Sequence, residues 1–160
     1  MRKFEKVSFE QFKKDVKDDK ELYDSYNLPK RETKYCAGYD FESLFDFTIK
    51  PGENMLIPTG IKADMNVGEM LLMIERSSQG FKYNMRMCNQ VGIIDKDYYN
   101  SPKNEGHIYI KLYNEGQNDY IVKKGDKIVQ GIFVNFLSVD NEDEIETERT
   151  GWAYLDNNRK

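Results

Sequence analysis

The sequence predicts an all-β domain with closed or sandwiched sheets, preceded by one short helix. From Tyr35 onward, short apolar or alternating runs of strand length recur, and turn dipeptides separate them. The length of 160 residues fits one domain, with residues 1–34 as helix and linker, 35–139 as the β domain and 140–160 as an acidic linker and C-terminal arm. We therefore expect a single core that buries roughly two-thirds of the unfolded surface.

The helix is expected just after the N-terminus. Ser8 and Gln11 are spaced as in a capping box, which satisfies the first backbone N–H groups of a helix. Apolar side chains then recur at helical spacing at Phe9, Phe12 and Val16. We interpret this helix as a packing element, with a surface for a regulatory protein partner as the alternative.

The strands follow from the alternation of side chains and from the turns between them. The expected strands are Phe45–Lys50, Met55–Ile57, Met70–Ile74, Ile108–Tyr113, Ile121–Val122 and Lys127–Phe136. Pro51-Gly52 and Gly125-Asp126 are turn dipeptides that end one strand and begin another.

Composition limits the classes of function. A formal net charge of −4 argues against nucleic acid or an anionic membrane as the main partner, and no run is long enough to span a bilayer. Cys36 and Cys88 indicate free thiols, and the N-terminus lacks a secretory signal, so we expect a cytoplasmic protein. With His107 as the single histidine, any metal is expected to be a hard cation held by oxygen.

One polar cluster is suited to phosphate. Arg76, Ser77 and Ser78 follow directly on the apolar run Met70–Ile74 and are followed by Gly80. Guanidinium, hydroxyl and backbone N–H groups at one strand end are the donors that phosphate oxygens accept from. The alternative is a polar turn without a ligand.

A second cluster, residues 89–98, combines a base-binding and an acidic end. Asn89 carries both a donor and an acceptor for a base edge, and the apolar stretch after it predicts a β-hairpin that a flat ligand can approach. Asp95 and Asp97 lie on one face if the strand is regular, and one of them could orient a water. Tyr98 could pack on a sugar, and the alternative is a tight turn with solvated acids.

The order of these motifs is more specific than any one of them. Ala-Gly-Tyr-Asp (37–40), Pro-Thr-Gly-Ile (58–61), Arg-Ser-Ser (76–78), the 89–98 segment, Gly-Asp-x-Ile-x-Gln (125–130) and Arg-x-Gly (149–151) follow one another. This series resembles the homotrimeric deoxyuridine triphosphatases (dUTPases) over most of the chain. The resemblance implies a distorted, jelly-roll-like β-barrel of the β-clip type and a homotrimer with active sites at subunit interfaces. It also implies Mg²⁺-assisted hydrolysis of dUTP to dUMP and pyrophosphate.

The resemblance also implies roles for single residues. Asp95 matches the carboxylate that activates the attacking water. Asn89 and the backbone at Gly92, Ile93 and Ile94 match the groups that frame the uracil.

Other residues of this sequence match those that bind the sugar and the phosphates in the family. Tyr98 matches the ring that packs on the deoxyribose and excludes a 2′-hydroxyl, and Tyr109 falls near the base pocket. The matching phosphate-binding residues are Arg76, Ser77, Ser78 and Gln130. Asp40 matches the acid that holds the magnesium ion through water.

The end of the chain departs from the family pattern. Arg149 and Gly151 match a glycine-rich arm that closes over the nucleotide, but the later glycines are replaced by bulky residues. Trp152 or Tyr154 could stack on uracil instead, or these rings could simply pack the tail down. Two other functions therefore stay open: a nucleotide-sensing regulatory protein with weak turnover, and an enzyme related to dCTP deaminase.

Overall fold

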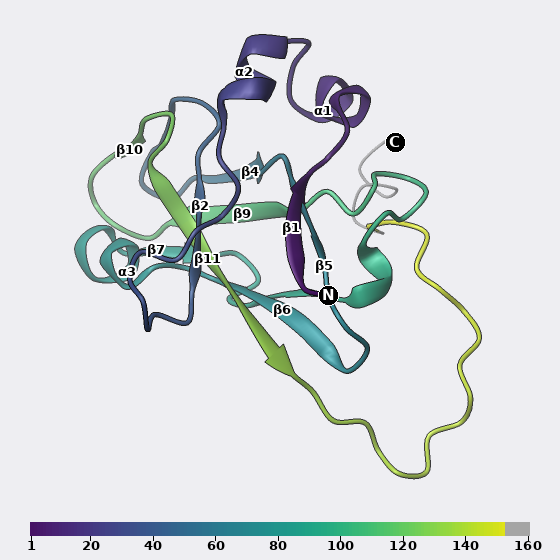
Figure 1. Ribbon diagram of the computed structural model, residues 1–160. Coiled ribbons are helices and arrows are strands. Elements are labelled where there is room, and N and C mark those ends of the chain that lie inside the picture. Colours follow the sequence, from purple (N-terminus) through teal and green to yellow (C-terminus); the bar gives the residue numbers. More distant parts are fainter. Residues whose placement is uncertain (153–160) are drawn as a thin grey trace.

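Antiparallel strand pairing folds the chain into four small sheets around one core in the computed structural model, which describes residues 1–152 (Figure 1). The strands are β1 (Lys3–Lys6), β2 (Tyr39–Glu42), β3 (Phe47–Ile49), β4 (Asn54–Pro58), β5 (Ile61–Asp64), β6 (Glu69–Ile74), β7 (Met85–Met87), β8 (Gly92–Ile94), β9 (Tyr109–Asn114), β10 (Tyr120–Val122) and β11 (Lys127–Asn135). The helices are α1 (Phe9–Asp15), α2 (Lys20–Ser25), α3 (Ser77–Tyr83) and the 3-10 turn η1 (Lys96–Tyr98). This strand-rich, jelly-roll-like arrangement confirms the predicted all-β class.

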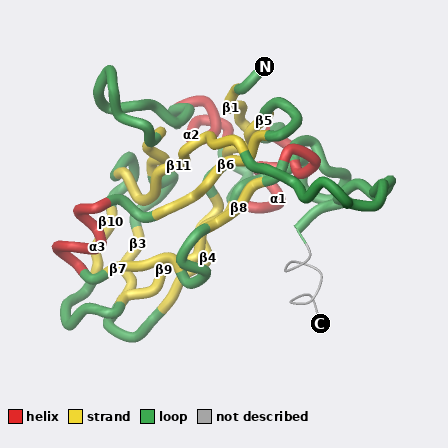
Figure 2. Tube along the Cα trace, turned by 90° about the horizontal axis from the view of Figure 1, so that it is seen from below, coloured by secondary structure: helices red, strands yellow, loops and turns green. Residues whose placement is uncertain are grey.

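Strands that are distant in sequence are neighbours in the sheets. β11 lies between β2 and β6, and β8 forms an edge of the same four-stranded sheet, in the order β2-β11-β6-β8. A three-stranded sheet has the order β4-β9-β7, and two-stranded ladders join β1 to β5 and β10 to β3 (Figure 2). Because β11 joins β2 to β6, the Ala-Gly-Tyr-Asp and Arg-Ser-Ser motifs both lie close to Gln130.

The strands with clear patterns appear at nearly the predicted positions. In β9, for example, Ile110 and Leu112 are buried and alternate with the partly exposed Tyr109 and Lys111. The short strands β1, β5 and β7 were not predicted, because three or four residues carry too little alternation to stand out. β1 consists of Lys-Phe-Glu-Lys and exists through its pairing with β5.

The core is apolar and is shared by several sheets. Its largest fully buried side chains are Phe12, Phe41, Leu44, Ile49, Ile57, Met65, Leu71, Met73, Met87, Ile108, Ile110 and Leu112. Phe12 comes from α1, so the N-terminal helix contributes to the same core as the strands. Of the helices in residues 1–152, none has the length and apolar character needed to cross a bilayer.

The helix α1 begins where the sequence predicts. The Ser8 hydroxyl accepts a hydrogen bond from the Gln11 N–H (3.1 Å), and Gln11 and Phe12 turn inward. α2, which was not predicted, is capped in the same way by Asp19 and lies beside α1 at one end of the molecule (Figure 1). The rings of Phe12 and Tyr26 stack with centroids 5.6 Å apart.

The C-terminal segment leaves the body of the protein after β11. Residues 136–148 are exposed, and Figure 1 shows them swinging wide before the chain returns to η1. Leu137 is 97% exposed, so the segment gains little from burial along its path. Its return is held by the ion pairs of Arg149 described below.

Candidate active site

Most of the predicted base, sugar and water-activating residues line one pocket of about 130 Å³. Its lining comprises Met73, Asn89, Gly92, Ile93, Ile94, Asp95, Tyr98, Tyr109, Arg149 and Trp152. β8 and η1 form one side of it, and β9 and the end of the C-terminal segment complete it. Residues from four separate parts of the sequence thus converge where the 89–98 segment predicted a ligand.

The predicted β-hairpin at 89–98 is wrong, and the real pairing explains how the pocket opens. After a turn at residues 88–91, β8 pairs with β6 rather than with β7, which belongs to another sheet. Gly92 makes this possible, since a Cβ there would lie 3.0 Å from the Cβ of Met73. As the edge of its sheet, β8 has a neighbouring strand on one side of its backbone only.

The two carboxylates also differ from the prediction, because the strand ends at Ile94. Asp95 is the N-cap of the 3-10 turn η1 and Asp97 lies within it, yet both reach the same partner. The Arg149 guanidinium lies 2.5 Å from Asp95 Oδ2 and 3.5 Å from Asp97 Oδ1. The backbone N–H of Arg149 also donates a hydrogen bond to the Asp97 carboxylate (3.0 Å). In this structure the side chain assigned to activate water is therefore paired with the chain's own arm.

Tyr98 is held from behind by a tight loop. Its hydroxyl donates to the His107 carbonyl (2.7 Å) and accepts from the side-chain amide of Asn104 (2.8 Å). Burial raises the pKa of Tyr98 to about 12, although the bond from Asn104 lowers it. The phenol is therefore neutral near pH 7, and its ring position depends on the loop from Asn100 to His107.

Gly106 gives that loop its shape and supplies a test of it. Its φ is +76°, and a Cβ would lie 2.3 Å from the Tyr98 carbonyl oxygen. We expect Gly106→Ala to lower the free energy of unfolding by roughly 2–3 kcal/mol, measured by denaturant unfolding. Gly68→Ala is the matched control, since Gly68 has a φ of +82° and a Cβ there would meet no atom within 4 Å. Equal losses in the two variants would show that the contact with Tyr98 contributes nothing.

Trp152 lies at the mouth of the pocket. Its ring packs on Tyr109 with centroids 5.4 Å apart and planes 30° apart, and Tyr109 in turn lies 4.5 Å from the His107 ring. Trp152 is thus placed where a base could contact it. Tyr154, the other candidate for stacking, lies outside the described residues.

The residues predicted to bind phosphate and magnesium lie at the other end of β6. Arg76 begins α3, and its guanidinium pairs with Asp40 (2.8 Å). Gln130 sits opposite Asp40 in the β2–β11 ladder and donates to the Glu75 carbonyl (3.2 Å). Ser78 lines a neighbouring depression of about 350 Å³ with Arg76.

Within one chain, the residues around Arg76 do not reach the pocket that contains Asp95. Ile94, the residue before Asp95, pairs with Leu71, whereas Arg76 lies beyond the opposite end of β6. At ~3.3 Å per residue, the run from Leu71 to Arg76 spans about 17 Å. The structure therefore brings Arg76, Asp40 and Gln130 together, and Asp95 stands apart from them.

Some contributors were not singled out from the sequence. Glu32 and Lys127 pair with each other and surround the Arg76–Asp40 pair, with Lys127 Nζ 3.3 Å from Asp40. Lys127 stands inside the Gly-Asp-x-Ile-x-Gln motif, so its position was a usable signal, whereas nothing in the sequence marked Glu32. Gln79 is buried, and its side-chain oxygen accepts a hydrogen bond from the Arg76 backbone N–H (3.1 Å), so it shapes the start of α3.

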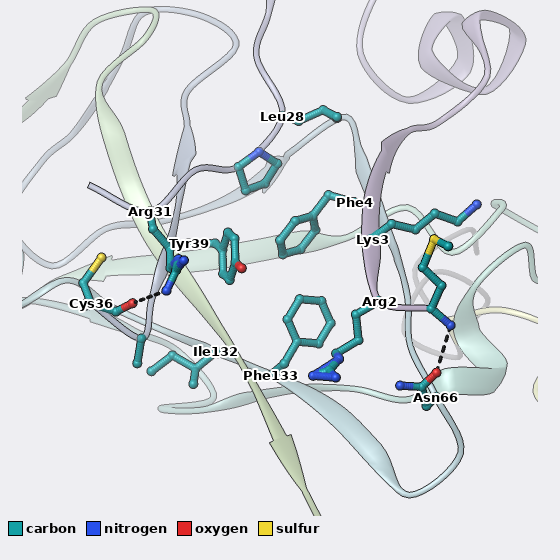
Figure 3. A pocket seen from close by; sticks show the side chains of 13 residues that line it. Arg2, Lys3, Phe4, Leu28, Arg31, Cys36, Tyr39, Asn66, Ile132 and Phe133 are labelled. Carbon is teal, nitrogen blue, oxygen red and sulfur yellow. Dashed lines mark hydrogen bonds between the residues drawn. The ribbon is translucent and has the colours of Figure 1, made fainter. Parts of the chain in front are cut away.

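A larger groove of about 830 Å³ lies between β1, β11 and the 28–39 segment (Figure 3). The rings of Phe4, Tyr39 and Phe133 lie close together in it, with 5.2 Å between the centroids of Phe4 and Phe133. Among its described lining residues are Ala37 and Tyr39 of the Ala-Gly-Tyr-Asp motif, but none to which the sequence assigned a binding or catalytic role. The chemistry is therefore assigned to the smaller pocket.

Comparison with known proteins finds similarity to dUTPases. A family model described as dUTPase matches residues 24–154. The deoxyuridine 5′-triphosphate nucleotidohydrolase of Lactococcus lactis subsp. lactis (strain IL1403) is 47% identical over 126 residues, which cover 78% of this chain and 84% of that protein. The enzyme of the same name from Haemophilus influenzae (strain PittEE) is 36% identical over 139 residues, which cover 82% and 87%.

Solved structures agree in fold. The crystal structure of dUTPase from Streptococcus mutans superposes with a TM-score of 0.70 at 38% identity, and the match covers 86% of this chain and 98% of that one. A dUTPase from phage phi11 of S. aureus, described with a structural Mg(II) ion, has a TM-score of 0.66 at 18% identity over 92% of this chain and 97% of its own.

Proposed function

The chain belongs to the dUTPase family, and on this premise we propose that it hydrolyses dUTP to dUMP and pyrophosphate, with Asp95 activating the water that attacks the α-phosphorus. The observation that supports this most is the convergence of Asn89, Asp95 and Tyr98 on one pocket beneath the exposed edge of β8. A base, a sugar and a water would each meet the kind of group that its chemistry needs.

The base and the sugar are recognised by position rather than by charge. The free edge of β8, from Gly92 to Ile94, offers backbone donors and acceptors to the edge of uracil, with the Asn89 amide at one end. The ring of Tyr98, fixed through its hydroxyl, packs on the deoxyribose and leaves no space for a 2′-hydroxyl. The base and sugar thereby hold the α-phosphorus in line with the water on Asp95.

The triphosphate is bound by the residues around Arg76. The Asp40 carboxylate pairs with both Arg76 and Lys127, and phosphate oxygens would compete for the same two cations. Ser77, Ser78 and Gln130 add neutral donors.

A magnesium ion fits this group, held by Asp40 through water. Within residues 1–152 no three His, Cys, Asp or Glu side chains cluster as direct ligands, and one carboxylate beside phosphates suits an ion that keeps most of its waters. When bound, the ion neutralises phosphate charge.

Complete sites require more than one copy of the chain. The roughly 17 Å between the Asp95 end and the Arg76 end of β6 separates water activation from phosphate binding within a chain. In a homotrimer, the Asp95 pocket of one copy would face the Arg76 group of the next. This arrangement agrees with the predicted homotrimer, in which each site lies at a subunit interface.

The function is tested by pyrophosphate release from dUTP, dCTP, dTTP and UTP in the presence of Mg²⁺. We expect kcat/KM for dUTP to exceed that for UTP on the order of 10²-fold, because Tyr98 excludes the 2′-hydroxyl. Equal rates on dUTP and UTP would contradict the role of Tyr98. Ammonia release from dCTP would indicate a deaminase, and tight dUTP binding without pyrophosphate would indicate a nucleotide sensor.

A further inference from the structure

The N-terminal helix α1 is fastened at both ends to the loop that supports Tyr98. At its start, the Ser8 hydroxyl and N–H both bond the Glu105 carboxylate, at 2.5 and 2.9 Å. At its end, Asp15 Oδ2 lies 2.6 Å from His107 Nδ1. Residues 1–23 precede the stretch that the family model matches, so this attachment belongs to the chain's own N-terminal part.

The contact between Asp15 and His107 allows one hydrogen-bonding arrangement. His107 is fully buried, and its Nε2 accepts a hydrogen bond from the Gly60 N–H (2.8 Å). Nε2 therefore carries no proton, so the proton of the neutral ring resides on Nδ1 and is donated to Asp15. The other tautomer would place two N–H donors face to face at Gly60.

Asp15 remains a carboxylate at this position. Burial raises its pKa, but hydrogen bonds from His107, Gln11 and Tyr109 outweigh burial and bring the pKa below its ordinary value. Gln11 is one turn earlier on the same helix, with its side-chain amide 2.8 Å from Asp15 Oδ2. Asp15 is thus a charged acceptor shared by several donors.

Two of the groups that depend on Asp15 lead into the nucleotide pocket. The His107 carbonyl accepts the hydroxyl of Tyr98, and Tyr109 both bonds Asp15 and packs on the His107 ring. Tyr98 and Tyr109 line the pocket on the sides assigned to the sugar and the base. The Asp15 carboxylate on α1 therefore helps to position two rings of the pocket, those of Tyr98 and Tyr109.

We propose that Asp15 is a positioning residue which, through His107, Tyr98 and Tyr109, sets the discrimination between deoxyribose and ribose nucleotides. The proposal rests on the proposed function, since it concerns the same pocket. Removal of the carboxylate leaves the buried His107 Nδ1–H without an acceptor, and neither tautomer repairs the loss. The ring and its carbonyl then shift, and Tyr98 shifts with them.

This displacement affects binding more than chemistry. Asp95 follows β8, which is held by its ladder to β6, and so it does not depend on α1. For Asp15→Ala we expect KM for dUTP to rise about tenfold and the dUTP/UTP ratio of kcat/KM to fall about tenfold, with kcat for dUTP within about twofold of the wild type.

The experiment compares matched variants of the full chain. Asp15→Asn keeps an oxygen acceptor for His107 and is expected to restore most of the dUTP/UTP ratio. Asp18→Ala removes the same charge from an exposed neighbouring position and should leave KM and the ratio unchanged. Thermal unfolding of each variant shows whether it is folded under the assay conditions.

The outcomes separate this proposal from the proposed function. If the wild type does not hydrolyse dUTP, the proposed function fails, and calorimetric binding of dUMP against UMP then decides the role of Asp15 by the same ratio. An unchanged ratio in a folded Asp15→Ala protein overturns the proposal, as does an equal fall of kcat on both nucleotides with no change in KM. If Asp15→Ala does not fold, Asp15→Ser is the second variant: its hydroxyl stands one bond nearer the backbone than the carboxylate oxygen and no longer reaches His107 Nδ1, so an unchanged ratio there overturns the proposal.

Discussion

Asp95→Asn is expected to lower kcat for dUTP hydrolysis on the order of 10³-fold, because an amide neither accepts the proton of the attacking water nor orients it as a carboxylate does. The fold should persist, since the Asp95 side chain is partly exposed and contacts Arg149 of the arm rather than the core. Pyrophosphate release under saturating dUTP measures kcat, and thermal unfolding verifies the fold.

Asp97→Asn is the matched control for that substitution. Asp97 lies on the same 3-10 turn and pairs with the same arginine, so its loss changes the local charge equally. We expect a fall of less than about tenfold, through weaker placement of the arm. Comparable losses in the two variants would mean that charge near Arg149, and not water activation, limits the rate.

Mixed trimers of two inactive variants should recover activity. If Asp95 and Arg76 act on one nucleotide from different copies, then Asp95→Asn and Arg76→Ala chains combine into some intact sites. When equal amounts assemble at random, about a quarter of the sites contain both a native Asp95 and a native Arg76. The mixture should therefore show about a quarter of the wild-type rate. Co-refolding the two purified variants and assaying pyrophosphate release measures this recovery.

The control for mixing uses two variants from the same group. Arg76→Ala mixed with Gln130→Ala leaves every site with one defective phosphate group, since both residues come from the same copy. That mixture should stay inactive. No recovery in the first mixture would show that each chain completes its own site, whereas recovery in the control mixture would show that Arg76 and Gln130 act from different copies.

The sequence predicted the parts of the structure in which local pattern and long-range packing agree. The alternation around Ile110 and the turn at Pro51-Gly52 are local signals, and the strands beside them appear as expected. β8 is different, because its pairing with β6 is decided by the close approach at Gly92 and not by a hairpin turn.

The site was predicted by residue type more fully than by geometry. The order of the motifs identified Asn89, Asp95 and Tyr98, and these residues do line one pocket. That Asp95 falls near the opposite end of β6 from Arg76 depends on the register of β8 against β6, which a strand of three residues carries too little pattern to predict. The link from Asp15 to His107 spans most of the chain and joins residues that carry no recognisable spacing.

The exposed segment from Phe136 to Arg149 acts as a tether with a definable reach. A flexible chain of this length has a root-mean-square span of about 20 Å, and the repulsion among its acidic residues extends it further. A short tether of this kind holds its end group at an effective concentration in the millimolar range. Arg149 therefore competes for Asp95 as a millimolar ligand would. Under the proposed function, an incoming nucleotide would displace it by mass action and leave the same guanidinium to meet the phosphates of that nucleotide.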